Sequence, residues 1–194
     1  EVGNPPHGQR IVTLNVNGLN SPIKRERVLR GLKREKAQII FLQETHLSPA
    51  EYKNRRGVAI IFQNSLNFEL TKEINDKEGR FVLLQGRLQQ MPITLFNIYV
   101  PPNSNKAFFH IILDLLASKS KATLICGGDF NLVLSHRLDT TSIKRLQSRE
   151  TRIMNNILVE LGLLDVWREL HNGDRVYTYY SVPHKVHSRL DCER

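Results

Sequence analysis

Four clusters of polar residues follow apolar segments of this chain, at the points where buried strands are expected to end. Polar side chains placed directly after an apolar run lie at a sheet edge, beside the loops. The four clusters are Asn15-Val16-Asn17-Gly18, Gln43-Glu44-Thr45-His46, Asn97-Ile98-Tyr99-Val100-Pro101 and Gly127-Gly128-Asp129-Phe130-Asn131. Taken singly they have ordinary explanations, namely Asn-Gly turns, a helix-capping carboxylate and a tight Gly-Asp-Phe turn. Together they supply carboxylate and amide oxygens, which suit Mg²⁺ and hydrolytic chemistry.

Strands dominate the elements that would position these clusters. The sequence predicts strands at residues 11–16, 38–43, 57–62, 68–74, 81–88, 93–100, 122–126 and 176–180. It predicts helices at residues 23–37, 107–116 and 149–163, where apolar residues recur at helical spacing. Helices do not follow every strand, so the pattern favours an α/β fold of two packed sheets covered by helices over a doubly wound parallel sheet. Without repeats or linkers, residues 1–194 are interpreted as a single domain.

The net charge of +9 favours a polyanionic partner, because neutralising phosphates releases counterions. Charge alone does not separate nucleic-acid binding from a merely basic surface. No apolar run is long enough to span a bilayer, and residues 1–10 lack the apolar core of a signal peptide. Of the two cysteines, Cys126 lies in an apolar run and is interpreted as a buried hydrophobe, which fits a reducing compartment.

Seven segments of the chain resemble, in order, the endonucleases of LINE-type (non-LTR) retrotransposons. The segments are LNVNGLNSPIKRERV, IIFLQETHL, GVAIIF, LFNIYVPP, GGDFNLVL, LDVWREL and YTYYSVPHKVHSRLD. Such enzymes belong to the endonuclease/exonuclease/phosphatase superfamily, together with the apurinic/apyrimidinic repair endonucleases. The resemblance runs from about Ile11 to Asp191. It implies a four-layer α/β sandwich, in which two mixed sheets pack face to face with helices outside.

The resemblance also implies a role for each polar residue. Glu44 would be the main metal ligand, with Asn17 nearby at a position where the repair relatives carry an acid. The metal would be Mg²⁺, with Mn²⁺ as an alternative. The remaining catalytic residues would be Asn15 and Tyr99 at the scissile phosphate, Asp129 on the attacking water, Asn131 on a phosphate oxygen and Asp191 in support of the site. Phosphodiester cleavage needs an in-line water and stabilisation of the developing charge, which these groups could provide.

The chain departs from the family at two places. Relatives close the site with a carboxyl-terminal strand and a Ser-Asp-His triplet, which do not follow the SRLD segment here. None of the seven histidines takes that place, and His46 is expected to serve local structure. The connection at residues 48–56 is also shorter than in the family. We expect that residues absent from this sequence, and not a genuinely shortened copy of the domain, account for both departures, because the other signatures are intact.

Two segments are candidates for DNA contact. Residues 178–188 (TYYSVPHKVHS) resemble the hairpin that the family places against a DNA groove, although a core strand with a mobile turn remains an alternative. The expected contacts are Thr178, Tyr180, Ser181, Lys185 and Ser188, with Arg149 and, more weakly, Arg145 and Arg152 as further phosphate contacts. The helix at residues 23–37 is densely basic, with Val28, Leu29 and Leu32 on one face; a solvated outer face is the favoured interpretation.

The sequence thus predicts a metal-dependent endonuclease that nicks one strand of duplex DNA. The resemblance implies that the resulting 3′-hydroxyl primes reverse transcription, and that the domain is part of a polyprotein with a reverse transcriptase. It would be made in the cytoplasm, act in the nucleus as a monomeric domain, and have no membrane partner. The alternatives are an abasic-site repair endonuclease, which Asn17 disfavours, and a catalytically impaired nucleic-acid-binding module. A lipid phosphodiesterase of the same superfamily is disfavoured.

Overall fold

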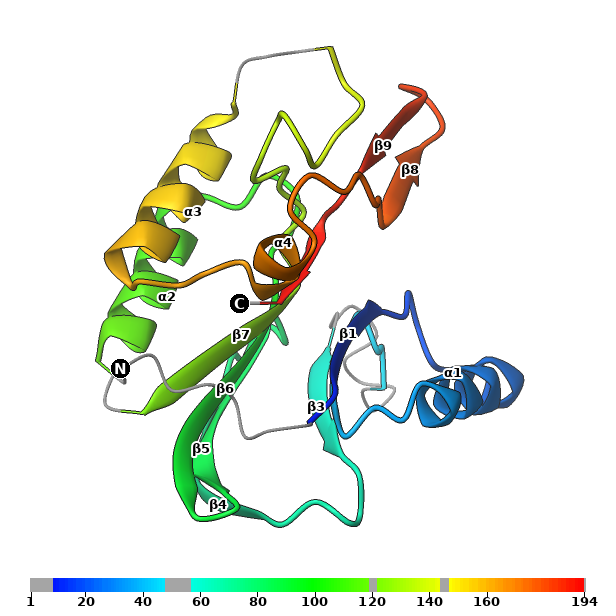
Figure 1. Cartoon of the computed structure of the whole chain (residues 1–194), viewed down its shortest axis with the longest axis vertical. Helices are drawn as coiled ribbons and strands as arrows, with labels where there is room; N and C mark the ends of the chain where they lie inside the picture. Colours follow the sequence, from blue (N-terminus) through cyan, green and yellow to red (C-terminus); the bar gives the residue numbers. More distant parts are fainter. Residues whose placement is uncertain (1–8, 48–56, 119–121, 144–146, 194) are drawn as a thin grey trace. The chain divides into compact units, whose positions relative to one another are not determined.

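The computed structural model describes residues 9–47, 57–118, 122–143 and 147–193. Contacts divide the chain into two compact units. The first consists of the described residues of Glu1–Tyr99 and Lys121–Asp129, and the second of those of Val100–Ser120 and Phe130–Arg194. Figure 1 labels the elements of both units.

The first sheet of the first unit has three strands in the order β1-β2-β3. They are β1 (Ile11–Asn15), β2 (Ile39–Gln43) and β3 (Val58–Phe62). Strands β1 and β2 are parallel, with Asn15 opposite Gln43, whereas β3 is antiparallel to β2. All five residues of β2 are buried, as its uninterrupted apolar sequence predicts, because a strand covered on both faces has no solvent side.

The second sheet of this unit contains four strands in the order β7-β6-β5-β4. They are β4 (Phe68–Asn75), β5 (Phe81–Leu88), β6 (Met91–Tyr99) and β7 (Thr123–Asp129). The first three form an antiparallel meander, and β7 runs parallel to β6. Gln89 and Gln90 join β5 to β6 with φ angles of 49° and 71°, as a tight two-residue hairpin turn requires. Both sheets are therefore mixed, as predicted.

The two sheets pack face to face through an apolar core. Ile39 and Phe41 of the first sheet meet Val82, Leu84 and Leu95 of the second. The sheets approach each other closely at Gly127 in β7, where an added Cβ would lie 2.4 Å from the ring of Phe41. A side chain at this position would force the sheets apart, so glycine is required there.

Helix α1 (Pro22–Arg34) covers the outer face of the first sheet (Figure 1). It begins at a capping residue, since the Ser21 hydroxyl accepts the N–H of Lys24, and proline at the first position fits this start. Leu32 is buried and Val28 half-buried against the sheet. Leu29, which the sequence placed on the same face, is 47% exposed, because the sheet touches a narrower strip of the helix.

The second unit contains three helices and three short strands. They are α2 (Lys106–Ala117), α3 (Arg149–Glu160), α4 (Val166–Leu170), β8 (Tyr179–Ser181), β9 (Val186–Ser188) and β10 (Asp191–Glu193). Helices α2 and α3 lie side by side (Figure 1). Each starts at a side-chain cap, as Asn105 accepts the N–H of Phe108 and Ser148 that of Thr151, both at 3.0 Å.

Several element boundaries differ from those predicted. Helix α1 ends at Arg34 instead of residue 37, because Lys36 adopts a left-handed φ of 54°. The strand expected at residues 176–180 begins only at Tyr179. Thr178 before it uses its hydroxyl to accept the N–H groups of Leu190 and Asp191, at 3.0 and 3.4 Å. Apolar periodicity did not indicate α4, β9 or β10, since three to five residues show none, and only the resemblance implied the hairpin to which β9 belongs.

Over the described ranges, no helix is both long and apolar enough to cross a membrane. The connection at residues 48–56 and Arg145 lie outside the described residues. The interpretation of residues 1–194 as one domain stays a prediction.

Candidate active site

Three strand ends of the first unit bring two carboxylates to one asparagine. Asn15 ends β1, Glu44 directly follows β2, and Asp129 ends β7. The Nδ2 group of Asn15 donates to Oε1 of Glu44 at 3.0 Å and to Oδ2 of Asp129 at 2.8 Å. Both amide protons of Asn15 are thereby used, and a neutral donor stands between two anionic groups.

The loops that carry these residues contain three non-glycine residues with left-handed backbone. Asn17, Glu44 and His46 have φ angles of 43°, 51° and 52°. Such conformations cost of order 1–3 kcal/mol each and persist where the surroundings impose them. Here the two loops are joined through their backbones, with Gly18 N–H donating to the Glu44 carbonyl at 2.6 Å and Leu19 N–H to that of Thr45 at 2.8 Å. The fold thus fixes the direction of Glu44.

Asn17 is held to the same edge by its main chain. Its N–H donates to Oδ1 of Asn15 at 3.0 Å, and its carbonyl accepts from Nζ of Lys24 at 2.7 Å. The Asn17 side chain is exposed. Asn15 therefore organises the whole cluster, since it contacts all three residues.

A buried network of polar side chains supports this edge from the interior of the first unit. The sequence did not predict this network. The fully buried Gln43 donates from Nε2 to Oδ1 of Asn97 at 2.6 Å and to Oγ1 of Thr13 at 3.1 Å. Asn97 in turn donates to the carbonyls of Leu42 and Ala59, at 2.9 and 2.8 Å. An amide from the second sheet thus cross-links two strands of the first. The only sequence signal is a pair of amide side chains inside apolar runs.

Strand β6 places Tyr99 at the same edge, because Tyr99 is the register partner of Asp129. Tyr99 is buried, and its N–H donates to the Arg80 carbonyl at 2.7 Å. Gly128, just before Asp129, has a φ of 145°, and a Cβ there would lie 1.9 Å from the Ile98 carbonyl oxygen. Close contact between β6 and β7 therefore leaves no room for any side chain at residue 128.

The Arg80 carbonyl is itself held by an ion pair between the side chains of Arg80 and Asp76. Nε and Nη2 of Arg80 donate to the two carboxylate oxygens of Asp76, at 2.7 and 3.1 Å. Burial raises the pKa of Asp76, but the hydrogen bonds and charge of Arg80 outweigh it and leave the pKa below its ordinary value. The same pair raises the pKa of Arg80. This bidentate contact fixes the turn that orients Tyr99.

His46 lies next to the carboxylates, with Nε2 3.9 Å from Oε2 of Glu44. Its ring also faces Gly18, where an added Cβ would be 3.3 Å from Nδ1. These contacts agree with the local structural role expected for His46.

The donors at this edge fit a hard cation held by few protein ligands. Across residues 9–47, 57–118, 122–143 and 147–193, no group of three or more His, Cys, Asp or Glu side chains could hold a metal ion. Magnesium usually keeps several waters and binds only one or two carboxylates. Glu44 and the amide oxygen of Asn17, in the loops that follow β2 and β1, offer oxygen ligands of this kind.

Asn131 and Asp191 belong to the second unit. Asn131 has a left-handed φ of 48°, and its Nδ2 donates to the Val100 carbonyl at 2.9 Å. Asp191 begins β10, and its N–H donates to the Thr178 hydroxyl. The structure therefore brings together Asn15, Asn17, Glu44, Tyr99 and Asp129 within one unit, and it gives Asn131 and Asp191 separate local supports.

Strands β8 and β9 form the expected hairpin. Tyr180 pairs with His187, and their rings lie 4.5 Å apart. Tyr180 is 46% exposed, and Lys185, in the turn, is exposed with a φ of 50°. Arg149 is exposed at the start of α3. These three side chains are available to a ligand.

Two hairpin residues differ from the expectation of DNA contact. Ser188 is buried, with its hydroxyl 3.2 Å from that of Thr140. The Thr178 hydroxyl accepts two backbone N–H groups at the end of the chain. Both residues thus hold the base of the hairpin. Beside it a hollow of about 700 Å³ is lined by Ser181, Lys185 and hydroxyl side chains such as Thr141 and Thr151.

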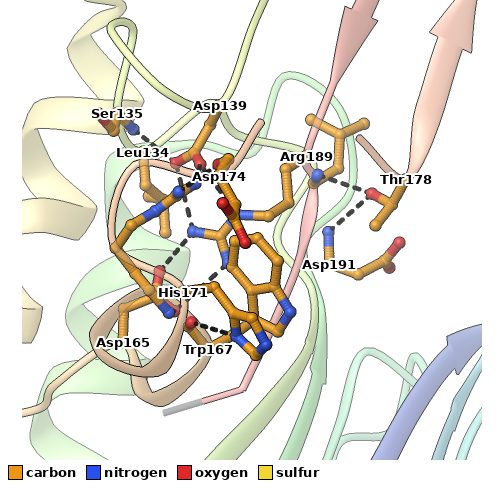
Figure 2. A network of polar contacts seen from close by, with 12 residues as sticks. Leu134, Ser135, Asp139, Asp165, Trp167, His171, Asp174, Thr178, Arg189 and Asp191 are labelled. Atoms are coloured by element: carbon orange, nitrogen blue, oxygen red, sulfur yellow. Dashed lines mark hydrogen bonds and ion pairs between the residues drawn. The ribbon is translucent and has the colours of Figure 1, made fainter. Parts of the chain in front are cut away.

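Arg189 is the centre of a second polar network, shown in Figure 2. Its side chain is 4% exposed and donates to Asp139 (Nε to Oδ1, 2.9 Å) and to Asp165. Arg168 contacts the same Asp139 at 2.5 Å, and the guanidinium groups of Arg168 and Arg189 lie 4.9 and 5.3 Å from the ring of Trp167. Ser188 and Asp191 were predicted as functional residues but Arg189 between them was not, because the partners of Arg189 are distant in sequence.

The model of the Endonuclease/Exonuclease/phosphatase family matches residues 12–191. The chain therefore belongs to this family. It is also 30% identical over 203 residues to the "Transposon TX1 uncharacterized 149 kDa protein" of Xenopus laevis; the alignment covers 93% of this chain and 15% of that protein.

Solved structures show the same fold. The endonuclease domain of TRAS1, a telomere-specific non-LTR retrotransposon, matches with a TM-score of 0.71 and 21% identity, over 96% of this chain and 84% of that domain. An AP endonuclease from Archaeoglobus fulgidus matches with a TM-score of 0.66 and 22% identity, over 96% of this chain and 86% of that one. The predicted fold class, an α/β sandwich of two mixed sheets, is confirmed.

Proposed function

We propose that this chain is the endonuclease domain of a LINE-type (non-LTR) retrotransposon, and that it nicks one strand of duplex DNA in a metal-dependent reaction. The observation that carries the proposal is the Asn15 amide, which joins Glu44 and Asp129 at one sheet edge in a member of this family. Further support comes from the similarity to the TX1 transposon protein and from the fold shared with the TRAS1 endonuclease domain. The net charge of +9 suits a polyanionic substrate.

The residues of the first unit would act as positioned donors and acceptors. Asp129, buried at the end of β7, would accept a proton from the attacking water, a role worth about 10²–10⁴-fold in rate. Asn15 would be a positioning residue, since both its amide protons are already donated to the carboxylates. Tyr99 would contact the scissile phosphate. Asn131 would donate to a phosphate oxygen, and Asp191 would support the site from the second unit.

Glu44, with Asn17 beside it, would hold the metal ion, for which Mg²⁺ is the proposed and Mn²⁺ the alternative species. The bound ion would stabilise the charge that develops on the phosphate during cleavage. The amide and carboxylate oxygens of this edge match the ligand preference of such ions.

The same comparisons support a proposal for the biological role. The chain covers only 15% of the TX1 protein, so we propose that it is one domain of a larger polyprotein that includes a reverse transcriptase. Its nick would leave a 3′-hydroxyl that primes reverse transcription on chromosomal DNA. The protein would then be made in the cytoplasm and act in the nucleus.

A supercoiled plasmid assay with Mg²⁺ tests the activity. Open circles should form, and the Glu44→Gln and Asp129→Asn variants should each lower the rate by at least about 10²-fold. Glu69→Gln and Asp114→Asn, which make the same changes at exposed positions, should retain the wild-type rate. A polymerase should extend the nicked product without prior phosphatase treatment, because the nick is expected to carry a 3′-hydroxyl. Wild-type rates in both site variants would rule out this active site.

An abasic-site repair endonuclease is the second candidate, because the AP endonuclease from Archaeoglobus fulgidus shares the fold. A comparison of initial rates on an intact duplex and on one with a single abasic site separates the two functions. Preference for the intact duplex supports the retrotransposon assignment, and strong preference for the abasic duplex supports repair. Binding without strand scission by the wild-type chain would instead indicate a non-catalytic module.

A further inference from the structure

Helix α1 has a charge distribution that its own folding does not require. It contains six basic residues and one acid, Glu26, which pairs with Arg30 at the exposed surface. The basic residues are Lys24, Arg25, Arg27, Arg30, Lys33 and Arg34. Among the described residues, no ion pair involves Arg25, Arg27, Lys33 or Arg34. Exposed strand β4 of the same unit is different, since Glu69, Lys72 and Glu73 alternate in sign.

Three positions in α1 act against helix stability. The first turn contains no acid and includes Lys24 and Arg25, although positive charge is unfavourable at the N-terminal end of the helix dipole. Gly31 lies in the helix interior, where glycine is among the poorest helix formers. A Cβ added at Gly31 would meet no atom within 4 Å, so packing does not demand a glycine. Positions that break a local rule without a structural reason are candidates for function.

Two of these positions, Lys24 and Gly31, lie on one flank of the helix together with Arg27 and Arg34. Lys24, Arg27, Gly31 and Arg34 follow the spacing i, i+3, i+7 and i+10, which places them in a single row about 15 Å long. We call this row the basic ridge. It is distinct from the strip of Val28 and Leu32 that packs on the first sheet. Because Gly31 has no side chain, the ridge has a gap between its arginines where another backbone can approach closely.

The basic ridge starts at the active-site edge. Lys24 Nζ donates to the Asn17 carbonyl at 2.7 Å, and the Asn17 N–H donates to Asn15, which contacts both carboxylates. A strand whose phosphate lay at this edge would therefore have the first residue of the ridge beside it, with Arg27 and Arg34 further along the helix.

We propose that the basic ridge binds the sugar-phosphate backbone of the duplex that is being cut, with Arg27 and Arg34 on phosphates and Gly31 as the point of closest approach. This inference rests on the proposed function, since it concerns the same DNA. Arginine suits the task because its planar guanidinium donates two parallel hydrogen bonds to a phosphate. The contacts would add affinity without sequence preference.

Gly31→Ala is the most informative variant, because it cannot fail by unfolding. Alanine should raise Tm by about 2–4 °C by favouring the helix. If the ridge binds a backbone, the added methyl should weaken duplex binding by about three- to tenfold. A stabilised variant with unchanged affinity would overturn the role of Gly31, as expected of a solvated outer face.

The salt dependence of binding counts the phosphate contacts. Affinity for a duplex is measured by fluorescence anisotropy without metal over a range of salt concentrations. The Arg27→Gln/Arg34→Gln double variant should lower the slope of log K against log salt by about 2, because each contact contributes about 0.9. Lys72→Gln/Lys77→Gln, which removes the same charge from exposed positions of the first unit, should leave the slope near wild type. Equal slopes in the two double variants would refute the ridge.

Two further measurements separate this inference from the proposed function and from another partner. Since binding is measured without metal, absence of nicking by the wild-type chain would refute the nuclease and leave the slopes decisive for the ridge. If the Arg27 and Arg34 changes weaken binding to single-stranded RNA but leave the salt slope for the duplex unchanged, the proposal that the ridge binds duplex DNA is overturned.

Discussion

Arg189 offers the most direct test of how the second unit is held together, through the variant Arg189→Ala. The guanidinium is 4% exposed and lies between Asp139 and Asp165, whose side chains are 2% and 11% exposed. In this variant the Asp165 carboxylate loses its contact with Arg189, while Asp139 keeps its contacts with Arg168 and with the Ser135 N–H. Most of the free-energy cost of such a change comes from the buried carboxylate that is left without a partner, and less comes from the lost attraction between the charges.

The expected loss is about 3–5 kcal/mol of unfolding free energy, the range for breaking one partner of a buried ion pair. For a chain of this size that corresponds to a fall in Tm of roughly 6–20 °C. Arg189→Lys keeps the charge but loses the planar fork, so its cost should be smaller. Arg30→Ala is the matched control, because the Arg30–Glu26 pair has side chains 73% and 70% exposed, and such pairs contribute at most about 1 kcal/mol.

Urea denaturation provides the measurement. Trp167 is the only tryptophan of the chain and contacts both arginines of the network, so its fluorescence reports on this region while circular dichroism reports on the whole chain. Loss of the network should lower the urea midpoint of both transitions. The fluorescence midpoint should fall at least as far as the circular-dichroism midpoint. A cost for Arg189→Ala no larger than that of Arg30→Ala would refute the reasoning.

Two further predictions concern the first unit. Asn97→Leu should lower the free energy of unfolding by about 2–4 kcal/mol, measured by urea denaturation, and should also lower the nicking rate. The variant leaves Gln43 Nε2 without one partner and removes the hydrogen bonds to the Leu42 and Ala59 carbonyls. An unchanged stability would mean that the cross-link between the sheets is dispensable. Asp76 has a pKa below the ordinary value of 3.8, so its contribution to stability is present above about pH 4 and is lost as pH falls through the folded pKa. Asp76→Asn should therefore reduce stability at neutral pH and flatten the decline below pH 4, and parallel pH curves for variant and wild type would contradict this.

The sequence predicts the parts of the fold that have local signals. Alternating or continuous apolar runs located β1 to β7 within a few residues, and the strand ends correctly marked Asn15, Glu44 and Asp129, which the structure joins. Asn15 and Glu44 meet because β1 and β2 are parallel neighbours, whereas Asp129 joins them from the second sheet, where β7 packs against β1.

The remaining features depend on contacts between residues far apart in the chain. Gln43 and Asn97 are 54 positions apart, and Arg189 and Asp139 are 50, so neither pair leaves a local pattern. Short elements such as α4 and β9 are set by the same contacts. Burial of Ser188 could not be foreseen either, because its partner Thr140 lies in another loop.

The left-handed conformations of Asn17, Glu44 and His46 have a consequence for the timing of the proposed reaction. The free-energy cost of these conformations is incurred when the chain folds and the two loops join through their backbones. No rearrangement of these loops would then be needed each time DNA arrives, because Glu44 and Asp129 are already held by Asn15. His46→Gly would relax one of these conformations and give the loop more freedom, so the loop would have to be ordered again at each turnover.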